Sequence, residues 1–200
     1  MDAFLSIALG IALAAATGFR VFVPLLAAGL AARTGWIPLT DTFSWLATTP
    51  ALVMLGTAAV FEAFAYFIPG VDHVLDVLAG PIAVAAGVIA SAAVMTDISP
   101  ALMWPLAIIA GGGVAGVTKG SAAVVRAKTG LTTAGLGNPI VSTAETTGSI
   151  VLSVLALLLP VVALAAIVAL LIWTIRKAGR LAFGARRKSG ALAAKNTKSP

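Results

Sequence analysis

The chain contains no cysteine and few charged residues. Only 10% of its 200 residues are charged, whereas about a quarter of a typical soluble domain is charged. The absence of cysteine excludes disulfides, thiolate metal sites and cysteine-based catalysis. No lysine or arginine precedes the first apolar run. Because secretory signals begin with a positive segment, we expect a first helix that is retained.

The chain is rich in apolar residues. Hydrophobic residues make up 60% of the chain, and the mean hydropathy is +1.07. Several stretches reach the length of about 20 apolar residues that a membrane-spanning helix needs. The sequence therefore predicts an all-α, multi-pass protein of the inner (plasma) membrane with about five spans. These spans cover roughly residues 4–32, 51–68, 77–95, 101–125 and 150–175.

Two of these spans contain helix-breaking residues. The first span holds Gly18 and Pro24, and the fourth holds the glycine cluster 111–113. Glycine and proline interrupt or kink helices. We therefore expect that the first and fourth spans can each be broken.

The basic residues are concentrated in the C-terminal tail. Eight of the 13 lysines and arginines follow residue 175, and no acidic residue follows Glu145. We expect residues 1–175 to form a single transmembrane domain and residues 176–200 to form a disordered cytoplasmic tail. This tail would attract anionic lipids of the bilayer. With Phe183 as its only aromatic residue, it predicts no nucleic-acid partner.

A weak internal repeat supports an inverted architecture. Residues 44–49 resemble residues 142–147 at an offset of 98. The repeat halves would cover about 5–68 and 103–173, with residues 77–95 as the linking span. Copies that begin three crossings apart are inverted in the membrane, an arrangement that recurs in transporters with sites near the midplane. Chance similarity between small-residue helices is the alternative interpretation.

Four charged residues lie in or beside the apolar spans: Arg20, Glu62, Lys119 and Glu145. A charge at the centre of a membrane helix costs about 2.5–3.5 kcal/mol on insertion scales, so such residues pair, are hydrated or have a function. Glu62 is kept neutral by burial, is paired with Arg20 or Lys119, or binds a proton or cation. Lys119 could instead extend to the headgroups. We expect the four to line a polar site.

The connections add further candidates. Asp72, His73 and Asp76 could bind a divalent metal ion, although Asp72 can equally be a helix N-cap. Asn138 belongs to a turn that enters the fifth span, and it joins the candidate binding residues. Ser142 with Glu145 three residues later fits either a capping box or a position that faces a substrate.

The glycine series at Gly112, Gly116 and Gly120 forms a small-residue helix face. Such a face lets helix backbones approach closely. It predicts tight helix packing within the chain or a homo-oligomer.

Several of these segments together resemble a known family of bacterial membrane proteins, the domain of unknown function 4126. The resemblance covers roughly residues 5–165 and implies membership without a defined activity. Family members often carry Ala-Asp-Lys where this chain has Ala65-Tyr66-Phe67, and Glu-Asp where it has Glu145-Thr146. The segments that carry the resemblance are Thr17-Gly18-Phe19-Arg20, Pro24-Leu25-Leu26, Glu62, Ile68-Pro69-Gly70-Val71-Asp72-His73, Asp76, Thr118-Lys119, Asn138-Pro139, Ser142 and Glu145.

These features favour a small transporter or channel for an ion or small solute. The alternative is a membrane protein that does not transport, such as a helper subunit, a lipid organiser or an assembly factor. A metal-dependent membrane enzyme would need a fuller ligand set than Asp72, His73 and Asp76 supply. We expect no enzymatic activity and no cofactor.

Overall fold

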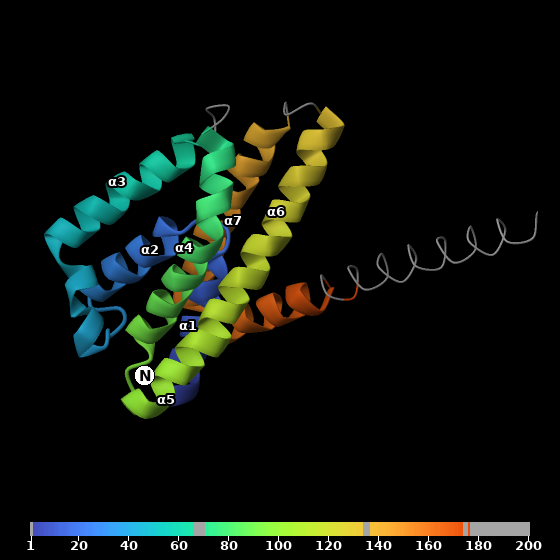
Figure 1. Ribbon diagram of the computed structural model, residues 1–200. Coiled ribbons are helices and arrows are strands. Elements are labelled where there is room, and N and C mark those ends of the chain that lie inside the picture. The colour runs from blue at the N-terminus through green and yellow to red at the C-terminus, as the bar shows by residue number, and fades with distance from the viewer. Residues whose placement is uncertain (1, 66–70, 134–136, 174–175, 177–200) are drawn as a thin grey trace, which may run out of the picture. The chain divides into compact units, whose positions relative to one another are not determined.

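The computed structural model describes residues 2–65, 71–133, 137–173 and 176, with the backbone alone for residues 71–77, and these residues form helices joined by short turns and loops, without strands (Figure 1). Residues Met1–Ile167 form one compact unit, and Val168–Pro200 form a second. The elements of the first unit are α1 (Ala3–Thr17), α2 (Phe22–Arg33), the 3₁₀ segment η1 (Asp41–Ala47), α3 (Thr49–Ala65), α4 (Val71–Val94), α5 (Pro100–Leu106), the π-helical segment η2 (Ala107–Gly112), α6 (Gly113–Thr133) and α7 (Asn138–Leu158). A further helix spans Pro160–Trp173.

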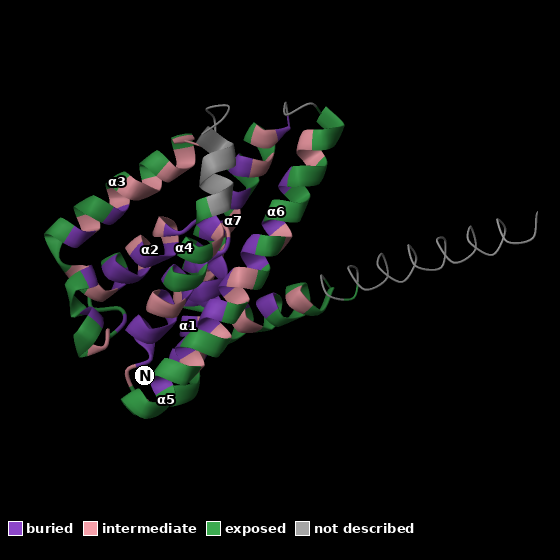
Figure 2. Ribbon diagram, in the orientation of Figure 1, coloured by how far each residue is buried: buried purple, intermediate pink, exposed green. Residues whose placement is uncertain are grey.

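The apolar helices fit a membrane protein. Two helices, Pro100–Thr133 and Asn138–Leu158, are long and apolar enough to cross a bilayer, and η1 with α3 makes a third candidate that is bent by 68°. Shorter apolar helices cover Ala3–Thr17, Phe22–Arg33, Leu78–Val94 and Pro160–Trp173. Large hydrophobic side chains such as Met54 and Phe64 of α3 are exposed on the outer faces (Figure 2). An apolar surface of this extent suits contact with lipid.

The α1 helix forms the centre of the compact unit. It packs against α2, α4, α6 and α7, and its residues from Ala8 to Thr17 are buried except Ile11. Most of these residues are alanine or glycine. Because small side chains let backbones approach closely, four helices can surround α1 at short range.

The expected break in the first span is confirmed. The helix ends at Thr17 and resumes at Phe22 as α2. Pro24 lies in the first turn of α2, where a missing N–H costs no intrahelical hydrogen bond. The break therefore places Arg20 between two helices, where its side chain is buried.

The fourth and fifth spans differ from the sequence prediction. The fourth is one continuous helix from Pro100 to Thr133 that contains the π-helical turn η2 at the glycine cluster, so the expected break there is wrong. A π turn inserts one residue without interrupting the helix. The expected fifth span of 150–175 is also wrong, because α7 begins at Asn138 and ends at Leu158, just before Pro160.

Two expected helix caps are also wrong. Ser142 lies inside α7, whose N-cap is Gly137, so Ser142 and Glu145 form no capping box. Val71 is already helical, so Asp72 lies within α4 and is not its N-cap. The side chains of Asp72, His73 and Asp76 lie outside the described residues, as do residues 177–200 of the predicted tail.

Gly18 lies close against α6 at the start of the break. A Cβ atom at Gly18 would lie 2.5 Å from Thr118 Cβ and 2.6 Å from the Ala115 carbonyl oxygen. Real Cβ atoms do not approach backbone this closely, so the helices would have to separate. We expect Gly18→Ala to lower the free energy of unfolding by about 1–3 kcal/mol, as overpacking does. Denaturant unfolding in detergent measures the effect.

Gly113 supplies the matched control for this prediction. A Cβ atom there would meet nothing within 4 Å, so Gly113→Ala should leave stability unchanged or raise it slightly. Equal stability of the two variants would contradict the close packing of α1 against α6.

Candidate functional site

Arg20 is buried at the helix break and binds two distant helices. Its side chain is 1% exposed. Nη2 donates to the Ser142 carbonyl oxygen at 2.9 Å and to Ser142 Oγ at 2.6 Å, and Nε donates to Thr146 Oγ1 at 2.9 Å. Nη1 lies 3.5 Å from the Glu62 carbonyl oxygen. The planar guanidinium carries five donors, and here it joins the break to α3 and α7.

Glu62 covers the first turn of α2 with its carboxylate. Oε1 accepts a hydrogen bond from the Val21 N–H at 2.9 Å, and Oε2 accepts one from the Phe22 N–H at 3.2 Å. These N–H groups have no partner within the helix, and the positive end of the helix dipole favours an anion there. The Glu62 carboxylate of α3 thus accepts hydrogen bonds from the N–H groups at the start of α2.

Two cations share the electrostatic environment of Glu62. The positive charges of Arg20 and Lys119 both act on the Glu62 carboxylate. Lys119 belongs to α6 and is 7% exposed, so it does not extend to the surface, and the snorkelling alternative is wrong. The interpretation of Glu62 as a counter-ion for Arg20 and Lys119 stays a prediction, and the hydrogen bonds of its carboxylate go to the backbone of Val21 and Phe22.

Glu145 forms a second buried pair with Arg126. Arg126 Nη2 donates to Glu145 Oε2, and the two side chains are 5% and 6% exposed. The other carboxylate oxygen, Oε1, is buried and accepts no hydrogen bond within the described part of the chain. A buried acceptor without a donor is costly, so Oε1 is a place where a proton, a water molecule or a ligand would bind.

Glu62 and Ser142 lie nearer to one end of their helices than to the middle. Glu62 lies three residues before the end of α3, and Ser142 lies four residues after the start of α7. At a rise of about 1.5 Å per residue, these positions are roughly 4.5–6 Å from the helix ends. Figure 1 places the ends of α3 and α6 and the start of α7 at the same end of the bundle. The site is therefore close to one mouth of the helix bundle.

The structure brings together part of the predicted set. Arg20, Glu62 and Ser142 form one hydrogen-bonded group, and Lys119 joins it electrostatically. Glu145 belongs to the separate pair with Arg126. Asn138 is the first residue of α7, and its place at the site stays a prediction.

Arg126 and Thr146 are site residues that the sequence prediction missed. We placed Arg126 beyond the fourth span, but α6 continues to Thr133. Its separation of seven residues from Lys119 puts both cations on one face of a helix, and both are buried. Thr146 lies four residues after Ser142 and donates to the Ser142 carbonyl oxygen at 3.0 Å. The seven-residue spacing from Lys119 was the available signal for Arg126, and the four-residue spacing from Ser142 was the available signal for Thr146.

The metal hypothesis is not tested. Among the described residues no group of three histidine, aspartate or glutamate side chains could hold a metal ion. The side chains of Asp72, His73 and Asp76 are outside that set, so the divalent site at these residues stays a prediction.

These features define a helical membrane protein with charged groups buried among apolar helices. The sequence matches the family described as Domain of unknown function (DUF4126) over residues 7–180. The chain belongs to this family, as the sequence motifs indicated. Neither the curated proteins nor the solved structures compared with the chain gave a match.

Proposed function

We propose that the protein is a transporter or channel for an ion or small polar solute. The observation that carries this proposal is Arg20, a buried charge in a helix break that contacts both α3 and α7. Broken helices in transporters expose backbone groups and helix ends that bind solutes. A charge kept in such a position is expensive, and function is the usual reason that it is retained.

The proposal gives Glu62 the role of coupling group. In the present arrangement its carboxylate holds the Val21 and Phe22 N–H groups and balances two cations. If a proton neutralised Glu62, this attraction would weaken, and the first turn of α2 would be released. Because α2 begins at the break, such a change would open or close the polar site beside Arg20.

The proposal includes the finer features of the sequence prediction. The protein would be a multi-pass protein of the inner membrane with a cytoplasmic C-terminus, and its halves would form an inverted repeat. The two matched positions differ in backbone, because the chain is broken at Arg20 and continuously helical through Lys119. Transport would therefore depend on an asymmetric site.

A flux measurement tests the proposal. The protein is reconstituted in liposomes, and gradients of protons, K⁺, Mg²⁺, chloride and phosphate are imposed in turn. We expect flux of one of these ions with the wild type. We expect at least a tenfold reduction with Glu62→Gln, equivalent to about 1.4 kcal/mol, because the amide keeps one acceptor for α2 but carries no charge.

Asp41→Asn is the matched control. It removes the same charge from an exposed position in η1, so its flux should equal that of the wild type. No flux for any tested ion, together with a fully functional Glu62→Gln protein in cells, would contradict the transport proposal.

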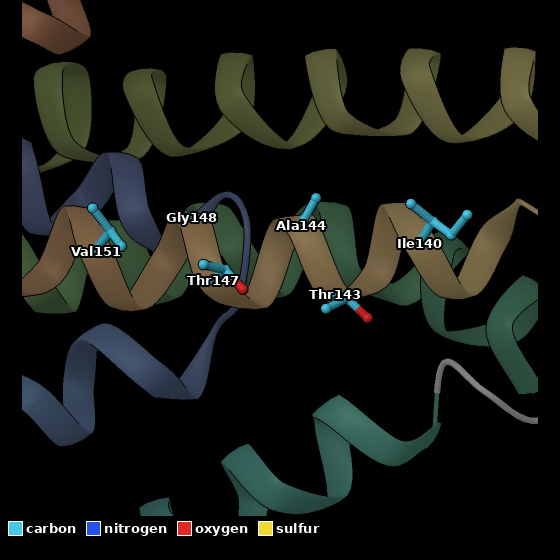
Figure 3. A pocket seen from close by; sticks show the side chains of 6 residues that line it. All are labelled: Ile140, Thr143, Ala144, Thr147, Gly148 and Val151. Carbon is cyan, nitrogen blue, oxygen red and sulfur yellow. The ribbon is translucent and has the colours of Figure 1, made fainter.

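A groove along α7 favours a second candidate, a non-transporting helper subunit or assembly factor. Its volume is about 690 Å³. Thr143, Ala144, Thr147 and Gly148 give it a small-residue floor that suits close packing of another helix. A protein of this kind would show no flux, and its function in cells would depend on the groove. Figure 3 shows the lining residues along α7: Ile140, Thr143, Ala144, Thr147, Gly148 and Val151.

A further inference from the structure

A cavity of about 300 Å³ lies between the first turn of α2, α3 and α4. Among the described residues that line it, Glu62 is the one charged side chain, and the others are apolar. Phe22, Phe61, Leu78 and Ile82 form its larger walls. This size is at the lower limit of small-molecule sites, which are typically apolar with a few polar groups that fix the ligand.

The cavity opens onto the outer apolar surface of the unit. Three of its lining side chains are strongly exposed: Phe61 by 70%, Leu78 by 53% and Ile82 by 47%. These residues belong to α3 and α4, whose exposed faces suit contact with lipid. An occupant would therefore enter from the bilayer, and the part that covers these walls would be apolar.

The polar end of the cavity selects a hydrogen-bond donor. Each oxygen of the Glu62 carboxylate accepts one backbone N–H, and a carboxylate oxygen can accept two hydrogen bonds. One acceptor position on each oxygen is thus left for a ligand. A hydrogen bond to a charged acceptor is among the stronger ones in proteins.

The charges around Glu62 favour a neutral donor over a cation. Arg20 and Lys119 already act on the carboxylate, and the first turn of α2 adds its positive dipole end. A further cation would be repelled by these groups and would lose its hydration. A hydroxyl group needs only one hydrogen bond on burial, and it adds no charge.

We propose that this cavity binds a neutral membrane lipid through its free hydroxyl group, chemically a long-chain alcohol. The hydroxyl donates to the Glu62 carboxylate, and the chain lies against Phe61, Leu78 and Ile82. This inference goes beyond the proposed function, because lipid binding does not require that the protein transport an ion.

Photolabelling of the full chain in phosphatidylcholine vesicles tests this binding. Three probes carry the same diazirine-labelled hexadecyl chain and end in a hydroxyl, a methyl ether or a trimethylammonium group. Mass spectrometry locates the adducts on peptides that contain residues 58–65 and 78–82. We expect the alcohol to label these peptides about tenfold more than the ether, which cannot donate a hydrogen bond. The ammonium probe should label no more than the ether.

Filling the cavity provides a second test. Ala58 lines the cavity, so Ala58→Phe should reduce labelling by the alcohol to the level of the ether. Val53→Phe is the matched control, because Val53 lies on the same helix, is 62% exposed and does not line the cavity. Its labelling should equal that of the wild type.

Three results would overturn the proposal: equal labelling by all three probes in the wild type, a preference for the ammonium probe, or undiminished labelling of Ala58→Phe. The probe comparison uses the unmodified chain, so it does not depend on the folding of any variant. A wild-type protein that shows no ion flux but retains the alcohol preference would separate this inference from the transport proposal.

Discussion

Arg20→Met is expected to cause a large loss of stability. Arg20 is 1% exposed and donates to Ser142, Thr146 and the Glu62 carbonyl oxygen. Methionine fills a similar volume but donates no hydrogen bond. It leaves the nearby Glu62 carboxylate with one cation fewer and leaves the acceptors of α7 without their donor. Removing one member of a buried charged group costs about 3–5 kcal/mol, and unfolding in detergent by denaturant measures this loss.

The Arg20→Lys variant shows whether stability depends on the shape of the guanidinium or only on its positive charge. An ammonium is a point charge on a flexible stem and cannot reach α3 and α7 with the spread of a guanidinium. We expect the lysine variant to recover only part of the lost stability. Arg33→Met is the matched control, because Arg33 is exposed and hydrogen-bonds to Thr49 at the surface. If the lysine variant matched the wild type, the bridging role of Arg20 would be refuted.

The helix break was predictable because its causes are local. Gly18 and Pro24 act on their own backbone, and both lie within the first span. The grouping of Arg20 with Glu62 and Ser142 was only partly predictable. Their charge and polarity identified them as residues needing partners, but Ser142 lies 122 residues from Arg20 along the chain. Which partners meet depends on helix packing that no short sequence window encodes.

Two predictions of helix ends were wrong, one at the glycine cluster and one at Pro160. The glycine cluster at 111–113 suggested a break, but a continuous helix absorbs it as a π turn. Pro160 was placed inside the fifth span, whereas α7 ends two residues before it. Ser142 and Glu145 also fitted a capping box in sequence, although they lie inside α7. Both side chains are buried, and neither caps the helix.

We also expect a large loss of stability when the Arg126–Glu145 pair is broken. Both side chains are buried, and Arg126 Nη2 donates to Glu145 Oε2. Glu145→Leu removes the carboxylate and leaves the guanidinium buried beside an apolar side chain. We expect a loss of about 3–5 kcal/mol in the free energy of unfolding, since a buried charge is expensive once its counter-ion is gone. The same unfolding measurement applies.

The double variant Arg126→Met/Glu145→Leu separates the cost of a lone charge from the worth of the pair. Replacing both members with apolar side chains of similar volume is often neutral or stabilising in buried pairs. We therefore expect the double variant to be more stable than Glu145→Leu alone, with a coupling energy of about 0.5–3 kcal/mol, the range for residues in contact. A double variant as unstable as the sum of its single variants would show that the pair is not energetically coupled. Recovery of stability without recovery of flux would instead assign this pair to the transport site, because only function would then require the charges.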